Sequence, residues 1–134
     1  LAVLMPIVAS MGGNAGTQTV TVAVRALALR QIDRDAASGF VQRELLVAVL
    51  NGCVFAFLAA SMSYLWFKDA DIATVMAVAM FANLVVAGVS GTIVPLGLVR
   101  AGVDPAVASS VLITTITDVV GFFVFLGLAA LYLM

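Results

Sequence analysis

The run LLVAVLNGCVFAFLAASMSYLWF, residues 45–67, decides the fold class of this chain, because it holds no charged residue between Glu44 and Lys68. A helix rises about 1.5 Å per residue, so about 20 apolar residues cross the roughly 30 Å hydrocarbon core of a bilayer. The run therefore predicts a transmembrane helix. It ends on Tyr64, Trp66 and Phe67, whose amphipathic rings favour the headgroup level and mark one membrane boundary.

Three further apolar stretches of similar length flank this run, at residues 1–24, 72–99 and 105–134. Together the four stretches predict an all-α membrane protein, a bundle of four transmembrane helices. The whole composition agrees, because 64% of the residues are hydrophobic, whereas soluble domains hold about 45–50% apolar residues. The chain begins at Leu1 inside a hydrophobic stretch, without a basic segment before it, which favours an excerpt of a longer protein over a signal peptide.

The sparse polar inventory excludes several classes of function. The chain has no histidine, Cys53 is its only cysteine, and its net charge is -1. One chain therefore cannot build a zinc or iron–sulfur centre, a disulfide framework or a Ser/His or Cys/His nucleophile, and it offers no basic surface to nucleic acid. We predict that it is not an enzyme and has no cofactor, and that Cys53 is a buried small hydrophobe.

Basic residues predict the orientation in the membrane. The first and third connections carry Arg25, Arg30, Arg34, Arg43 and Arg100, whereas the second carries only Lys68. Short loops rich in lysine and arginine stay in the cytoplasm, so the first and third connections are predicted inside and both chain ends outside.

Small residues and prolines predict local features of the third and fourth spans. Ala87, Gly88 and Gly91 predict close helix packing where lipid supplies no hydrophobic drive. Pro95 predicts a kink or an end of the third helix. Asp104 followed by Pro105 predicts the start of the last helix.

Asp118 is the only formally charged side chain well inside a span. It follows Pro105 by thirteen residues, about 20 Å along a helix, which places it in mid-membrane. An aspartate there costs roughly 2.5–3.5 kcal/mol on insertion scales, and the spans hold no basic residue to pair with it. A functional role is favoured, and the alternative is a protonated or hydrogen-bonded aspartate that holds the bundle together.

Polar residues at helical spacing form one stripe on the last span and another on the first. The last span carries Ser110, Thr114, Thr117, Asp118 and Gly121, and the first carries Asn14, Thr17, Gln18, Thr21 and Arg25. Two such stripes with a mid-span carboxylate predict an aqueous path, whereas threonines alone also serve interhelical hydrogen bonding. Gly12, Gly13 and Gly16 predict either a constriction lined by backbone carbonyls or close helix contact.

The available ligands favour a hard cation. Carboxylate, amide and hydroxyl oxygens, without imidazole, suit magnesium, calcium or manganese better than zinc or copper. A proton or sodium route through Asp118 is equally compatible with these residues, so the chemistry alone leaves both open.

Two segments carry a family resemblance. Residues 6–30, PIVASMGGNAGTQTVTVAVRALALR, and residues 104–121, DPAVASSVLITTITDVVG, resemble the membrane domain of the MgtE magnesium transporters, which are related to the animal solute-carrier family 41. The resemblance covers essentially the whole chain and matches the last four of the family's five transmembrane helices. It implies that residues 1–134 are a transmembrane domain, and that the family's first helix and its cytosolic N-terminal and CBS domains lie outside this stretch.

The resemblance also implies a function and its residues. The chain would be part of a homodimeric magnesium channel in the bacterial plasma (inner) membrane, with Mn2+, Co2+ or Ca2+ as less favoured ions. The family's selectivity aspartate falls on Asp118. Its other pore positions fall on residues of the two stripes: Gly13, Asn14, Thr17, Thr21, Ser110 and Thr114. Some members have Asn-Pro where this chain has Ser110-Val111, and backbone carbonyls at these positions could also serve the ion. One alternative is a divalent cation transporter coupled to protons or sodium. The other is not a transporter at all, but an assembly or anchoring subunit that carries no ion flux.

Overall fold

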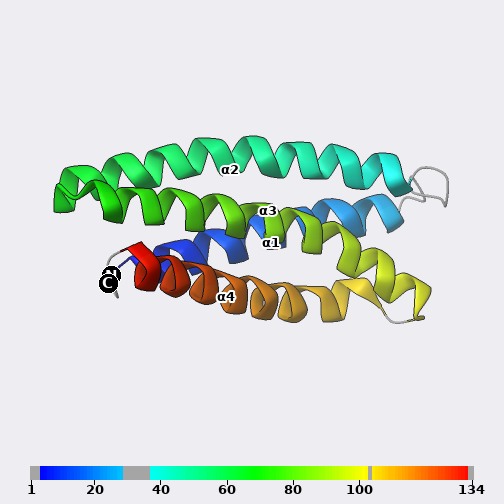
Figure 1. Ribbon diagram of the computed structural model, residues 1–134. Coiled ribbons are helices and arrows are strands. Elements are labelled where there is room, and N and C mark those ends of the chain that lie inside the picture. The colour runs from blue at the N-terminus through cyan, green and yellow to red at the C-terminus, as the bar shows by residue number, and fades with distance from the viewer. Residues whose placement is uncertain (1–3, 29–36, 103, 133–134) are drawn as a thin grey trace.

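The chain forms an up-and-down bundle of helices in the computed structural model, which describes residues 4–28, 37–102 and 104–132 (Figure 1). Helix α1 spans Met5–Ala28, α2 spans Ala37–Phe67, α3 spans Ala70–Arg100 and α4 spans Pro105–Tyr132. The described residues hold no strand, which confirms the predicted all-α bundle.

The helix boundaries follow the sequence signals closely, with one departure. α2 ends at Phe67, behind the aromatic cluster, and α4 begins at Pro105, both as predicted. α2 begins at Ala37, well before the apolar run, so Arg43 and Glu44 belong to the helix and not to a loop. Between α2 and α3, the Asp69 side chain accepts a hydrogen bond from the Asp71 backbone N–H at 2.9 Å and caps α3.

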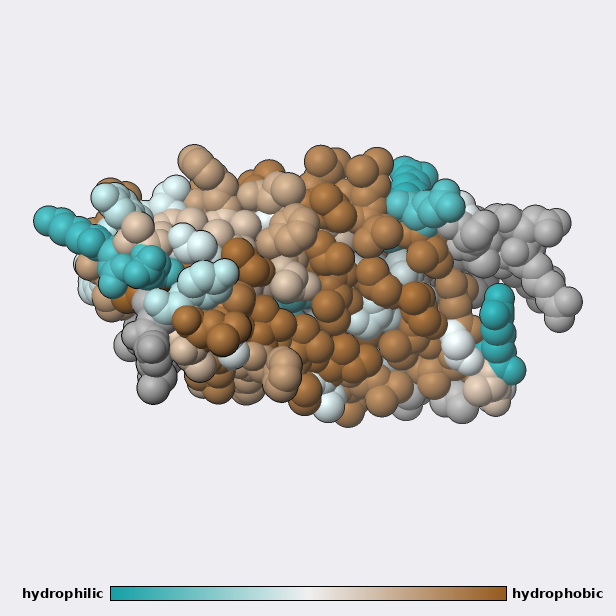
Figure 2. All heavy atoms as spheres, in the orientation of Figure 1, coloured by the Kyte–Doolittle hydropathy of each residue, from teal (hydrophilic) through white to brown (hydrophobic). Residues whose placement is uncertain are grey.

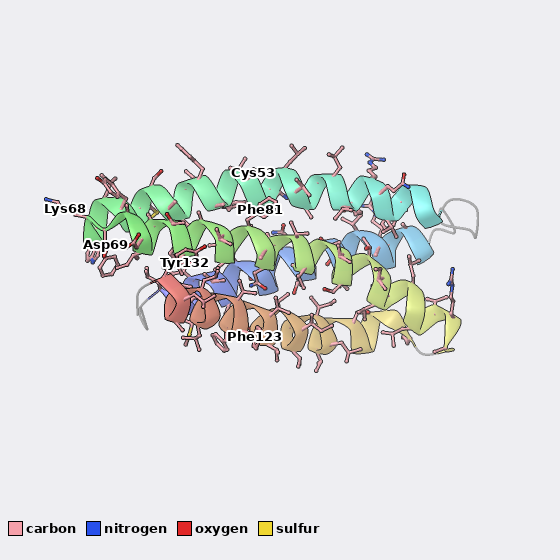
Figure 3. All side chains as sticks on the ribbon, in the orientation of Figure 1. Cys53, Lys68, Asp69, Phe81, Phe123 and Tyr132 are labelled. Atoms are coloured by element: carbon pink, nitrogen blue, oxygen red, sulfur yellow. The ribbon has the colours of Figure 1, made fainter. Side chains whose placement is uncertain are left out.

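The connections alternate between the two ends of the bundle (Figure 1). The end of α1, the start of α2, the end of α3 and the start of α4 share one end, and the α2–α3 connection lies at the other. Figure 3 places Lys68 and Asp69 at that second end, away from the last turns of α1 and α3, which carry Arg25 and Arg100. The first and third connections are predicted on one side of the membrane and the second on the other, and this arrangement of the helices is compatible with that prediction.

Helix α3 is the centre of the bundle, since it packs against α1, α2 and α4, and α1 also packs against α4. The main apolar core lies around α3, and its most buried members include Val8, Val75, Met76, Ala79 and Phe125. α2 rests chiefly on α3, so most of its circumference is left for lipid or for another helix.

Small residues bring the helices close to α3, as predicted. A Cβ built on Gly88 would overlap the Cβ of Ala48 in α2, and one built on Gly91 would lie 2.7 Å from the Cβ of Thr19 in α1. Pro95 is buried inside α3, which continues past it to Arg100. The alternative that the helix ends at Pro95 is therefore wrong, and a kink at Pro95 stays a prediction.

The surface is that of an integral membrane protein. Figure 2 shows a broad hydrophobic belt with hydrophilic residues gathered towards the two ends. Large apolar side chains such as Phe57, Leu65 and Phe123 are 72%, 75% and 78% exposed, and Figure 3 shows Phe123 projecting from α4. Cys53 also lies exposed on α2, so the prediction that it is buried is wrong, because only one side of α2 packs against α3.

Three of the helices, in the part of the chain that the structure describes, are long and apolar enough to cross a membrane: Gly39–Phe67, Ala70–Arg100 and Val111–Tyr132. α1 is not among them, although it runs beside α3 along the bundle. Its glycines and its polar stripe lower its hydropathy, which suits a helix with one face turned to water. A fourth crossing by α1 stays a prediction.

Candidate functional site

Asp118 lies near the middle of α4 and is half-buried. Within residues 4–28, 37–102 and 104–132, no hydrogen bond or ion pair engages its carboxylate. An ionised carboxylate at this depth requires a compensating charge or water, because hydrocarbon supplies neither. The structure therefore gives no support to the alternative that Asp118 is tied into the bundle by hydrogen bonds within the chain.

The stripes of α1 and α4 meet beside Asp118, at Gly13 and Thr117. A Cβ built on Gly13 would lie 4.0 Å from the Thr117 hydroxyl oxygen, an ordinary contact distance. Thr117 is buried, and its hydroxyl donates to the carbonyls of Ile113 at 2.9 Å and Thr114 at 3.2 Å. Thr117 is thus satisfied within its own helix, which leaves Asp118 as the unpaired polar group of α4 at this level.

The predicted pore residues of α1 face out of the bundle. Asn14, Thr17 and Thr21 are exposed, and Gly13 is half-buried. Thr17 donates its hydroxyl to the Gly13 carbonyl and Thr21 donates to the Thr17 carbonyl, both at 2.9 Å. These bonds satisfy the hydroxyl protons and leave oxygen lone pairs along the exposed face, where they can accept hydrogen bonds from water.

Regular backbone at the glycines of α1 decides between the two predictions made for them. α1 is helical from Met5 to Ala28, so its carbonyls accept intrahelical bonds and form no constriction. Gly16 instead packs against α3 and α4: a Cβ there would overlap the Ile113 side chain and lie 3.7 Å from the Cβ of Ala87. The prediction of close helix contact is confirmed, and the carbonyl-lined constriction is wrong.

The predicted residues of α4 divide between the surface and the bundle. Thr114 is exposed, whereas Thr117 and Gly121 are buried. The Ser110 side chain lies outside the described residues, so its predicted role stays a prediction. In α1, Gln18 lies at the edge of the stripe next to α2, where it lines a separate cavity. The two stripes are therefore adjacent, but they form an outer face of the bundle and do not enclose a path between them.

Asn83 of α3 is a buried polar residue that the sequence analysis missed. It has no exposed surface, and its side-chain Nδ2 donates to the Val8 carbonyl of α1 at 2.9 Å. A Cβ on Gly12 would overlap this amide, and one on Gly121 would lie 3.0 Å from Nδ2. Asn83 therefore fills a space that the glycines of α1 and α4 leave open. The available signal was a lone amide within the apolar run MFANLVV, residues 80–86.

The side chains that could bind a metal ion at this site carry little charge. No group of three or more histidine, cysteine, aspartate or glutamate side chains that could hold a metal occurs among the described residues. Asp118 is thus a single carboxylate beside neutral oxygens, on an exposed face at membrane depth. Such a face suits transient contact with a hydrated cation better than a dehydrated, permanently bound metal.

Comparison with known proteins agrees with this geometry. The model of the MgtE family, described as divalent cation transporters, matches residues 5–128. This chain belongs to the MgtE family. Membership in a family described as transporters agrees with the prediction that the chain is not an enzyme.

Curated MgtE relatives cover nearly the whole chain. It is 35% identical to the magnesium transporter MgtE of Bacillus subtilis over 133 residues, and 36% identical to that of Thermus thermophilus over 134 residues. The magnesium transporter MgtE of Enterococcus faecalis is 31% identical over 134 residues. These alignments cover 99% of the chain but only 29–30% of the relatives, so the chain spans less than a third of their length.

Proposed function

We propose that this chain forms the membrane-embedded path of a magnesium transporter, along the polar faces of α1 and α4. Its family and its relatives, which are magnesium transporters, support magnesium as the transported ion. Asp118 would select the ion, and Gly13, Asn14, Thr17, Thr21, Ser110 and Thr114 would line the path. The proposed location is the bacterial plasma (inner) membrane.

The observation that carries this proposal is the outward direction of the polar face. Asn14, Thr17, Thr21 and Thr114 are exposed on a bundle that shows a broad hydrophobic belt on the face drawn in Figure 2. Polar groups at membrane depth are costly against lipid, so this face requires a polar surface opposite it. A second copy of the chain, related by a twofold axis, supplies that surface and converts an open face into an enclosed path.

Charge supports the same assembly. One Asp118 would leave a divalent ion half neutralised in a medium where unpaired charge is expensive. Twofold symmetry brings two Asp118 carboxylates to one ion, which matches the charge of magnesium. The proposed functional unit is therefore a homodimer.

Magnesium's hydration defines how the ion is held. The ion demands octahedral geometry with oxygens at about 2.0–2.1 Å and releases its waters slowly. The exposed hydroxyl and amide oxygens and the two carboxylates would accept hydrogen bonds from the water shell, which selects the ion and still releases it. The carboxylate oxygens would then lie about 4 Å or more from the metal, roughly twice the direct distance.

Substitution of Asp118 tests the function directly. The full-length protein, reconstituted in liposomes with a magnesium indicator inside, should carry a magnesium flux that Asp118→Asn abolishes or severely reduces. Asp71→Asn is the matched control, because Asp71 is an exposed carboxylate in the first turn of α3, far along the bundle from Asp118. Wild-type flux in Asp118→Asn, with dimers intact, would contradict the proposal.

Passive conduction and ion coupling are separated by the same liposomes. A channel should follow the membrane potential without a proton or sodium gradient, whereas a coupled transporter should show a fixed stoichiometry with one of those ions. We favour the channel, because Asp118 lies on an open face and has no partner within the described part of the chain.

A further inference from the structure

A partly open cavity with polar side chains lies on the other side of α1 and is lined by α1, α2 and α3. Its volume is about 150 Å³. The polar side chains that line it are Gln18 and Thr19 of α1 and Glu44 and Asn51 of α2, and α3 contributes Leu84 and Gly88. The Asp118 site instead lies where α1 meets α4, so the two sites occupy different sides of α1.

Glu44 lies within the membrane-spanning part of the bundle. A Cβ built on Gly88 would lie 3.8 Å from the Glu44 backbone carbonyl, so these two residues share one level. Gly88 stands twelve residues before the end of α3 and eighteen after its start, about 18 Å and 27 Å along the helix. Both ends are thus farther away than the roughly 15 Å that separates the centre of a bilayer from the edge of its hydrocarbon core.

The polar side chains at this cavity lack partners within the protein. In the described parts of the chain, no hydrogen bond or ion pair engages the side chains of Glu44, Gln18 or Asn51. Thr19 donates its hydroxyl to the Ala15 carbonyl at 3.0 Å, which leaves the oxygen lone pairs available. Neighbouring Arg43 is exposed and does not pair with Glu44. A half-buried carboxylate and two exposed amides therefore face this cavity without a partner in the described chain, and at membrane depth such groups are costly unless water or a cation solvates them.

We propose that this cavity binds one alkali metal cation, with Glu44 as the neutralising charge and the side-chain oxygens of Gln18, Asn51 and Thr19 as further ligands. A single carboxylate balances a single positive charge and leaves a divalent ion half neutralised. A proton would neutralise Glu44 but leave both amides without a partner. The volume of about 150 Å³ has room for a cation with a few waters.

Helix α1 connects the cavity to the proposed magnesium path, because it carries residues of both. Gln18 follows Asn14 by one helical turn, so the two side chains are neighbours on α1. An ion that orders Gln18 therefore acts on the same helix that carries the polar face. Cation binding at Glu44 does not require a particular ion at Asp118, because Glu44, Gln18 and Asn51 face the cavity whichever ion moves along the path.

Calorimetric titration of the purified full-length protein tests the site. Sodium chloride or potassium chloride is added to protein held in choline chloride at constant ionic strength, without divalent ions. We expect saturable binding of one alkali ion per chain, and the two salts identify whether sodium or potassium is preferred. Glu44→Gln should weaken binding by about tenfold or more, because Glu44 is the only charged residue among the described residues that line the cavity.

Two further variants keep the test decisive. Asn51→Ala removes one oxygen ligand but keeps the charge, so it should weaken binding severalfold. It replaces Glu44→Gln as the test variant if Glu44→Gln does not fold. Asp118→Asn should bind the alkali ion as the wild type does. Absence of saturable alkali binding, unchanged affinity in folded Glu44→Gln, or loss of binding in Asp118→Asn alone would each overturn the assignment.

Discussion

Asn83 in the middle of α3 donates its side-chain amide to the backbone carbonyl of Val8 in α1, at 2.9 Å. The same amide lies beside Gly12 of α1 and Gly121 of α4, so one side chain sets the spacing of the two helices that carry the proposed path. Its Oδ1 is buried and has no partner among the described residues. Asn83 thus links the packing of the core to the geometry of the polar face.

Replacement of Asn83 should destabilise the bundle. Asn83→Ala removes the bond to Val8 and leaves a void between Gly12 and Gly121, and we expect a loss of about 1–2 kcal/mol, since interhelical hydrogen bonds in membranes contribute about 1 kcal/mol or less and the void adds to that. Thermal unfolding in detergent measures the change. Asn14→Ala is the control, because Asn14 is exposed and unpaired in the described chain; equal losses in both variants would refute the role of Asn83.

A methyl group at Gly12 should be tolerated badly, unlike one at Gly127. A Cβ on Gly12 would overlap the Asn83 amide and lie 2.7 Å from its Cγ, whereas one on Gly127 would meet nothing within 4 Å. We expect Gly12→Ala to cost about 1–3 kcal/mol by overpacking. Gly127→Ala should be neutral, or stabilising by up to about 1 kcal/mol from helix propensity. Measured in the same detergent, the unfolding temperature should fall for Gly12→Ala and stay equal or rise for Gly127→Ala.

Cross-linking tests whether the polar face is an interface between two copies. In a Cys53→Ser background, Thr17→Cys or Thr21→Cys should give covalent dimers with a short bis-maleimide, because identical residues near a twofold axis approach each other. Phe57→Cys, on the exposed side of α2, is the matched control and should stay monomeric. Dimers in the control alone, or an active monomer after reconstitution, would exclude the proposed assembly.

Labelling from the two sides of the membrane tests the orientation. Single cysteines near Arg34 or at Gly102, in the Cys53→Ser background, should react only from the cytoplasm, and a cysteine at Asp69 only from outside, because the arginine bias sets the orientation. The structure places the start of α4 and the α2–α3 connection at opposite ends of the bundle, so these labels must differ. The reverse pattern would invert the assignment without changing the fold.

Competition with an inert complex tests outer-sphere recognition. A cobalt hexammine cation mimics hydrated magnesium but does not exchange its ligands, so it should inhibit magnesium flux if Asp118 contacts only the water shell. Asp118→Asn should lose this inhibition along with the flux. Absence of competition, or a bound-ion structure with Asp118 oxygens at about 2 Å from the metal, would show direct coordination instead.

Local sequence patterns predicted much of this protein. Hydropathy gave the class and the long helices, the aromatic residues and Pro105 gave the ends of α2 and the start of α4, and Asp118 stood out because charge inside an apolar run is costly wherever the helix packs. These signals are visible in the sequence because each depends on a residue and its near neighbours along one helix.

Tertiary structure decided which faces meet, because the crossing of helices determines the neighbours of a side chain. Asn83 and Gly12 are far apart in the chain, and they come into contact only because α3 packs on α1. Glu44 precedes the apolar run in the sequence, where a loop position is expected. In the structure α2 begins at Ala37, so Glu44 is helical and lies at the level of Gly88. Helical periodicity placed Asn14 and Thr17 on one face, but only the packing of α1 against α3 and α4 turned that face outward, since the glycines of α1 take the contact side.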